Sequence, residues 1–158
     1  MIEFWGTTAG SILMTLLISM VPVLELRAAI PAGVIAGLDI PVVVTVAIIG
    51  NLIPIPFIIV FIRKIFKWMQ TKSEKLAALV KRLEEKADRK KDKVLKYEFW
   101  GLMFFVAIPL PGTGAWTGAL IAAMLDMQLK RAFPAIAAGV VIAAVIVTVA
   151  TYGVAALI

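Results

Sequence analysis

The chain has 158 residues, of which 62% are hydrophobic, and it contains neither cysteine nor histidine. Its net charge of +6 is concentrated in residues 63–98, which hold 13 of the 16 Lys and Arg and six of the ten Asp and Glu. Without thiols or imidazoles we expect no disulfide, no metal or cofactor site and no enzyme activity. A mean hydropathy of +1.01 is too high for a small soluble domain, so the composition predicts an all-α integral membrane protein.

Residues 1–62 are predicted to form a first structural unit. Its opening apolar limb lacks the basic start of a cleaved signal peptide, so we expect it to stay in the mature protein. Residues 4–38 consist of two apolar limbs that are broken at "VPVLELRAAIP" (21–31). The uncharged segment 41–62 follows, which is long enough to cross a bilayer as a helix.

Residues 63–98 are predicted to be a basic, amphipathic cytoplasmic connector. Apolar residues recur near a 3.6-residue period, which predicts a helix over 67–97. Attraction to anionic lipid headgroups is the expected role, and a coiled-coil contact with a second protomer is an alternative. The acidic residues interleaved with the basic ones argue against nucleic-acid binding.

Residues 99–158 are predicted to repeat the first unit. "EFWG" occurs at residues 3–6 and again at 98–101, and a shift of 87 residues aligns Pro22 with Pro109 and Asp39 with Asp126. A two-residue slip then aligns Gly50 with Gly139. The second copy has a hairpin over 99–125, a tip at "IPLPGTGAWTG" (108–118) and a transmembrane segment over 132–157.

The two hairpins are predicted to be re-entrant, so that they dip into the membrane and return. If 99–125 crossed the bilayer, Lys130 and Arg131 would face outside, against the positive-inside tendency. The second limb of each hairpin has eleven residues, which as a helix reach about half the depth of the hydrocarbon core. The two halves would then be inverted repeats whose tips meet near the midplane, as in many transporters. Small residues at four-residue spacing predict close packing of these limbs, at Ala28, Ala32 and Ala36, and at Ala115, Ala119 and Ala123.

Glu25 and Arg27 are the only ionisable residues deep within the apolar blocks, which makes them candidate functional residues. If the tip is a turn the two can pair with each other; if it is helical they need other partners. In the second tip the glycines leave backbone N–H groups open near the start of a helix, where an anion can bind. The candidate substrate-binding residues are Arg27, Glu25, Gly112, Thr113, Gly114, Asn51 and Thr117, with Glu25 also the candidate proton-coupling group.

The strings "ELRAAIPAG", "GN" and "PLPGTGAWTGA" resemble the small multidrug export protein family over nearly the whole chain. That family is distantly similar to the DedA-type membrane proteins, whose members have paired re-entrant hairpins. This resemblance implies translocation of polyprenyl phosphates or phospholipids by membrane-embedded acidic and arginine residues, which would be Glu25 and Arg27 here. The second tip has none of the additional charged residues typical of DedA-type proteins.

The leading hypothesis from the sequence is a small transporter of an anionic lipid head group, with undecaprenyl phosphate or a phospholipid as substrate. The alternative is a proton-coupled small multidrug exporter with Glu25 as its central site. A third reading is a scaffold that works through the connector. We expect multi-pass insertion in a bacterial or archaeal inner membrane, contacts with membrane lipids and assembly as a homodimer.

Overall fold

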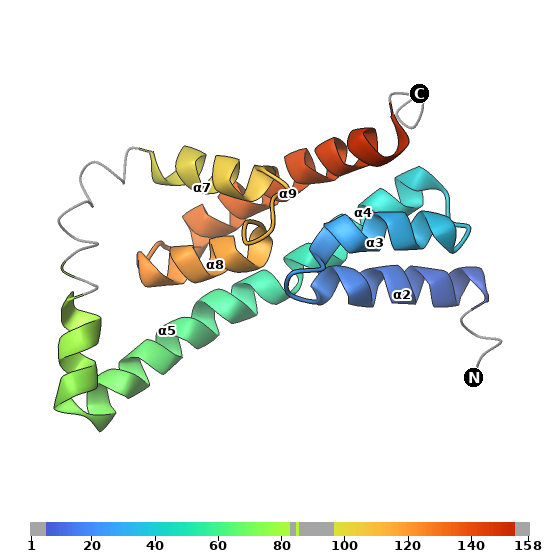
Figure 1. Cartoon of the computed structure of the whole chain (residues 1–158). Helices are drawn as coiled ribbons and strands as arrows, with labels where there is room; N and C mark the ends of the chain where they lie inside the picture. Colours follow the sequence, from blue (N-terminus) through green and yellow to red (C-terminus); the bar gives the residue numbers. More distant parts are fainter. Residues whose placement is uncertain (1–5, 83–84, 86–96, 154–158) are drawn as a thin grey trace.

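The structure is a computed structural model that describes residues 6–82, 85 and 97–153, and all regular secondary structure in this part of the chain is helical. The predicted all-α fold is therefore confirmed for the described residues. Each half of the molecule begins with a hairpin of two short helices (Figure 1). Within this described part, two helices, Ile40–Lys72 and Leu129–Tyr152, are long and apolar enough to cross a membrane.

The first half contains the hairpin α2 (Thr8–Met20) and α3 (Glu25–Ile35), followed by α4 (Ile40–Leu52). The Thr7 hydroxyl oxygen accepts the Gly10 N–H at 3.2 Å and so caps the start of α2. Helix α2 ends at Met20, two residues before Pro22. The chain turns between α3 and α4 at Gly37, whose φ of +86° allows the Leu38 N–H to reach the Gly33 carbonyl at 3.1 Å.

Helix α5 (Pro54–Lys72) continues the path of α4 after the single residue Ile53. Pro54 and Pro56 lack N–H groups, so two hydrogen bonds of a continuous helix are missing at this junction. The prediction of one continuous connector helix over 67–97 was wrong at Ser73. The backbone there is extended (φ −155°, ψ 136°) and separates α5 from a short helix over 74–82. The later part of that prediction lies outside the described residues.

The second half contains the hairpin α7 (Glu98–Ala107) and α8 (Ala115–Met124), followed by α9 (Leu129–Tyr152). Prolines 109 and 111 keep α7 from continuing into α8. At the other end of α8, Asp126 takes a positive φ of 52° and the Met127 N–H reaches the Ala122 carbonyl at 2.9 Å. This closing turn matches the one after α3, where Gly37 takes the place of Asp126. The sequence alignment had paired Asp126 with Asp39, so it was wrong by two residues at this turn.

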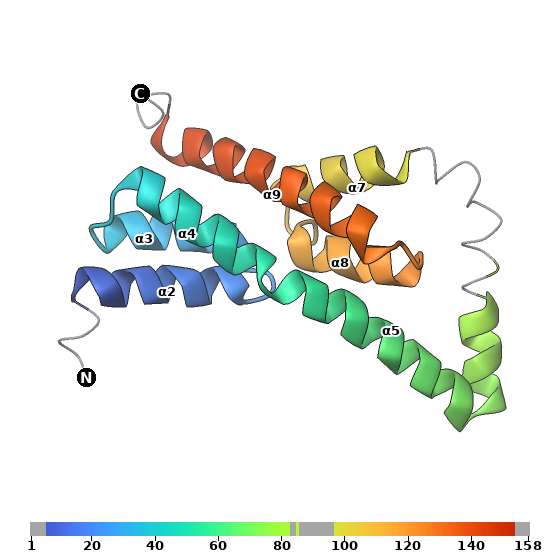
Figure 2. The ribbon, with the colours of Figure 1, turned by 180° about the vertical axis from the view of Figure 1, so that it is seen from behind.

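The two hairpins approach the centre of the molecule from opposite ends, and their tips meet there (Figures 1 and 2). Within each half the helix that follows the hairpin, α4 or α9, packs closely on the first helix of that hairpin through a glycine. A Cβ on Gly50 would lie 2.7 Å from the Leu16 carbonyl oxygen of α2, and a Cβ on Gly139 would lie 2.7 Å from the Met103 carbonyl oxygen of α7. The same contact thus recurs in both halves, at the glycines that the sequence alignment pairs. Their relation as inverted repeats in a membrane stays a prediction.

The predicted small-residue face is correct for α8, where Ala115, Ala119 and Ala123 are buried. In α3 the alanines Ala28, Ala32 and Ala36 are only half-buried, and the close packing expected of this face occurs at Gly33 beside them, where a Cβ would lie 2.7 Å from Thr15 Oγ1 of α2. The buried face of α3 instead consists of Leu26, Ala29, Ile30 and Gly33, together with Glu25. Larger side chains fill this interface because α3 packs on both α2 and α4.

Candidate functional site

The two hairpin tips are joined by a buried carboxylate. Glu25 is the first residue of α3 and is only 4% exposed. The backbone N–H of Trp116, in the first turn of α8, donates to Glu25 Oε1 at 3.1 Å, and the neighbouring N–H of Ala115 also favours the charged carboxylate. These are N–H groups that a helix cannot satisfy itself, and they lie at the positive end of its dipole. The carboxylate of one tip therefore caps the helix of the other.

Gly114 makes this approach possible because it has no side chain. Its φ of +129° lies in a region that residues with a Cβ rarely adopt. A Cβ at this position would lie 2.9 Å from Glu25 Cδ and closer still to Oε2. Glycine is thus required at position 114 both by the backbone conformation and by the carboxylate packed against it.

Arg27 makes the second link between the tips. Its Nη2 donates to the Thr113 carbonyl oxygen at 2.6 Å and lies 3.1 Å from Thr113 Oγ1. The Thr113 hydroxyl also accepts the Leu110 N–H at 3.2 Å and contacts the Ile108 carbonyl oxygen, so it closes its own loop. The half-buried guanidinium is held by a turn that is itself internally bonded.

Glu25 and Arg27 belong to one helix and do not form an ion pair among the described residues, although they are close enough for a Coulomb attraction. Of the two arrangements that the sequence left open, the structure has the helical one, in which each charge bonds to the opposite tip. The carboxylate occupies the α8 N-terminus, where an anionic ligand was expected from the sequence.

The backbone around Glu25 is strained. Glu25 has a φ of 45° and Val23 a φ of 74°, both in the left-handed region that side chains other than those of Gly, Asn and Asp seldom adopt. Such conformations cost on the order of 1–3 kcal/mol each and persist where surrounding contacts enforce them. Here the enforcing contacts are the hydrogen bonds to α8.

Trp116 makes two hydrogen bonds to the first hairpin tip. Besides the backbone hydrogen bond to Glu25, its indole N–H donates to the Met20 carbonyl oxygen at 3.2 Å. That carbonyl is one of the groups left unpaired at the end of α2. A tryptophan just after the glycine turn was the signal in the sequence, but its partner on another helix could not be read from it.

The other predicted site residues make no hydrogen bond to Glu25 or Arg27 in the described structure. Gly112 is exposed in the loop with φ +85° and open space around its Cα. Thr117 is half-buried in the first turn of α8. Asn51, near the end of α4, is fully buried, and neither its side-chain nitrogen nor its oxygen has a hydrogen-bond partner in the described structure. A buried amide without partners is costly, which marks Asn51 as a group available to a polar ligand.

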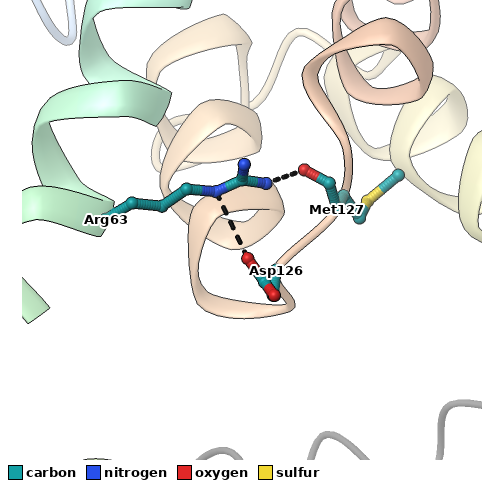
Figure 3. Close-up of polar contacts among 3 residues, drawn as sticks. All are labelled: Arg63, Asp126 and Met127. Atoms are coloured by element: carbon teal, nitrogen blue, oxygen red, sulfur yellow. Dashed lines mark hydrogen bonds and ion pairs between the residues drawn. The ribbon is translucent and has the colours of Figure 1, made fainter. Parts of the chain in front are cut away.

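A second polar cluster, not predicted as a site, joins α5 to the turn between α8 and α9 (Figure 3). Arg63 Nε lies 3.5 Å from Asp126 Oδ1, and Arg63 Nη2 donates to the Met127 carbonyl oxygen. Asp126 is the only acidic residue in the second half after Glu98, which was the available signal. No group of three or more Asp and Glu side chains able to hold a metal occurs in the described residues.

Comparison with known families gives one match, to the family described as "Putative small multi-drug export protein", over residues 25–146. The match begins at Glu25, within the first hairpin tip, and covers the second tip and most of α9. No curated protein and no solved structure matches the chain significantly. The distant similarity to DedA-type proteins stays a prediction. Together with the two long apolar helices, the family match indicates a membrane protein of an export family.

Proposed function

The chain belongs to the small multi-drug export protein family, and from this premise we propose that it moves an anionic lipid head group across the membrane through the contact between its hairpin tips. A phospholipid or undecaprenyl phosphate has the required chemistry. The observation that carries the proposal is the Glu25 carboxylate bound to the first turn of α8. That turn binds an anion supplied by the protein itself.

Arg27 gives the site the second property that a phosphate group requires. Guanidinium groups bind phosphate oxygens through paired N–H donors, and this geometry is stronger and more specific than a single point charge. Arg27 now uses Nη2 on Thr113, at the edge of the same glycine turn. A phosphate placed there would meet the guanidinium and the amides of the α8 N-terminus together.

Glu25 and the substrate would exclude each other, since both are anions and both use the same N–H groups. Protonation of Glu25 removes its charge and weakens its hold on α8. In this scheme a proton displaces the carboxylate, the substrate head takes its place, and return of the carboxylate expels the substrate. The lipid tail would remain in the bilayer throughout.

Access from the two sides would follow from the opposed hairpins. Each half is packed internally through a glycine contact, at Gly50 in one half and Gly139 in the other. The contacts between the tips consist instead of a few hydrogen bonds to Glu25, Arg27 and Trp116. Rocking of one half against the other would therefore open the site to one leaflet at a time.

The second candidate is a proton-coupled exporter of cationic drugs, which the family description favours. In that scheme the buried Glu25 carboxylate binds either a proton or the drug cation. Arg27 argues against it, because a cation near the carboxylate repels a cationic substrate. The two candidates thus make opposite predictions for loss of Arg27.

The test is transport in vesicles that contain the purified protein. Arg27→Ala should abolish translocation of an acyl-labelled fluorescent phosphatidylglycerol from one leaflet to the other, and Arg131→Ala, which removes an exposed arginine at the start of α9, should not. Wild-type protein that moves no anionic lipid, but whose expression raises resistance to lipophilic cations with Arg27→Ala still active, would instead establish the drug exporter.

A further inference from the structure

A cavity of about 240 Å³ lies where α5 passes the C-terminal end of α8, the end opposite to the hairpin tip. Its cationic lining comes from Arg63 and Lys67 on α5, four residues apart and therefore on one face of that helix. Its apolar lining includes Phe66 from α5, Val80 from the helix over 74–82 and Met124 from α8. A cavity with cations on one part and hydrocarbon on another matches an amphiphile.

Arg63 in this cavity has an N–H group without a hydrogen-bond acceptor in the described part of the chain. Arg63 Nη2 donates to the Met127 carbonyl, but the Nε–H makes no hydrogen bond with any described residue, although Nε is shielded from solvent. The Asp126 carboxylate lies within ion-pair distance of Nε (Figure 3), yet its side chain is 80% exposed and it forms no hydrogen bond with the Nε–H. The described residues thus leave one buried guanidinium N–H available to a further acceptor.

The position of the cavity along the helices places it at a membrane surface. No charged residue occurs from Ile40 to Ile62, and 23 residues of helix span about 34 Å, close to the thickness of the hydrocarbon core. Arg63 is the first charge after that span. Lys130 and Arg131, at the start of α9, lie three and four residues after Met127, whose carbonyl oxygen Arg63 binds. The cavity therefore lies at the level of lipid head groups, on the side that the basic residues assign to the cytoplasm.

We propose that this cavity binds the phosphate group of an anionic phospholipid of the inner leaflet. The phosphate bridges Arg63 and Lys67 and accepts the unpaired Nε–H, while the apolar wall of Phe66, Val80 and Met124 takes the start of an acyl chain. Asp126 opposes binding, so the exposed carboxylate turns toward solvent when the lipid is present. The inference requires membrane insertion only and does not depend on what Glu25 and Arg27 transport.

Native mass spectrometry of the full-length protein in detergent tests the proposal, with phosphatidylglycerol, phosphatidylcholine and inorganic phosphate as probes. Arg63→Gln should weaken phosphatidylglycerol binding about tenfold and Lys67→Gln about threefold, since the first removes a shielded donor and the second an exposed charge. Lys64→Gln removes the same charge from the residue next to Arg63, which is outside the cavity lining, and should leave the affinity for phosphatidylglycerol unchanged. Melting temperatures confirm that each variant is folded.

Asp126→Asn separates a lipid site from a purely structural ion pair. If the carboxylate competes with phosphate, the variant binds phosphatidylglycerol more tightly, by about threefold. Equal binding of phosphatidylglycerol by Arg63→Gln, Lys67→Gln and Lys64→Gln would overturn the site. Equal binding of phosphatidylcholine would overturn the requirement for an anionic lipid, and equally effective competition by inorganic phosphate would overturn the assignment to a lipid.

Discussion

The carboxylate of Glu25 is packed directly on the Cα of Gly114, with no room between them for a methyl group. One residue comes from the first hairpin tip and the other from the second. Their contact orients Glu25 toward the N–H of Trp116 at 3.1 Å. The two tips are therefore in direct contact, and a substitution in either tip should alter the packing of the other.

Gly114→Ala is expected to destabilise the protein by about 2–4 kcal/mol, because it adds a clash with Glu25 to a backbone conformation that disfavours a side chain. The measurement is unfolding in detergent, followed by tryptophan fluorescence. Gly112→Ala is the matched control: its φ of +85° is also positive but the space around it is open, so about 1 kcal/mol of backbone strain is expected.

The double variant Gly114→Ala with Glu25→Ala removes the clash and leaves only the backbone strain. It should lose less stability than the sum of the two single changes, as residues in contact generally do. Strict additivity would show that the carboxylate does not lie against position 114.

Glu25→Gln is expected to slow transport and to remove its dependence on pH, because the side chain can no longer alternate between a neutral and a charged form. The amide keeps the size of the side chain and an oxygen that can accept the Trp116 N–H, but it carries no charge and takes up no proton. The measurement is lipid translocation in vesicles at a series of pH values, with wild-type protein beside it. A variant that retains the full pH response would assign the proton step to another group.

Thr113→Val is expected to loosen the second tip, because the lost hydroxyl bonds Arg27, the Leu110 N–H and the Ile108 carbonyl. Hydrogen exchange at the amides of residues 110 and 113 should accelerate about tenfold, which corresponds to the loss of a hydrogen bond of ordinary net strength. Thr117→Val, a change of the same kind in the first turn of α8, is the control and should leave those amides unaffected.

Asn51→Leu is expected to raise the melting temperature while lowering transport. The leucine removes two buried polar groups that have no partners in the described structure, each of which costs about 1–3 kcal/mol. If Asn51 serves a ligand, the stability gained is accompanied by lost activity. A stabilised variant with wild-type transport would limit Asn51 to a structural role.

The hairpin tips could be predicted because their chemistry is local. Prolines 109 and 111 stop α7, and Gly114 permits a turn that a larger residue would not. The isolation of Glu25 and Arg27 in apolar sequence marked them as a site whatever their partners. These signals depend only on residue type and spacing, so they survive without knowledge of the fold.

The partners could not be predicted, because they depend on the distance between helices and not on order along the chain. Glu25 bonds to Trp116, 91 residues away, and Arg27 to Thr113, 86 residues away. The apolar pattern of the connector likewise continued through Ser73, where the backbone leaves the helix. Periodicity reports which residues face inward but not where a helix of that pattern is interrupted.

The junction at Ile53 has a consequence for how the molecule can bend. On one side of it, α4 packs on α2 and α3, and on the other side α5 packs chiefly on α8. The helical path Ile40–Lys72 is therefore shared between the two halves, and Pro54 and Pro56 leave the carbonyls of Gly50 and Leu52 without their usual N–H donors. Any rotation between the halves must pivot here, one turn from Asn51, so cross-linking across residues 50–57 should freeze the protein without touching a charged group.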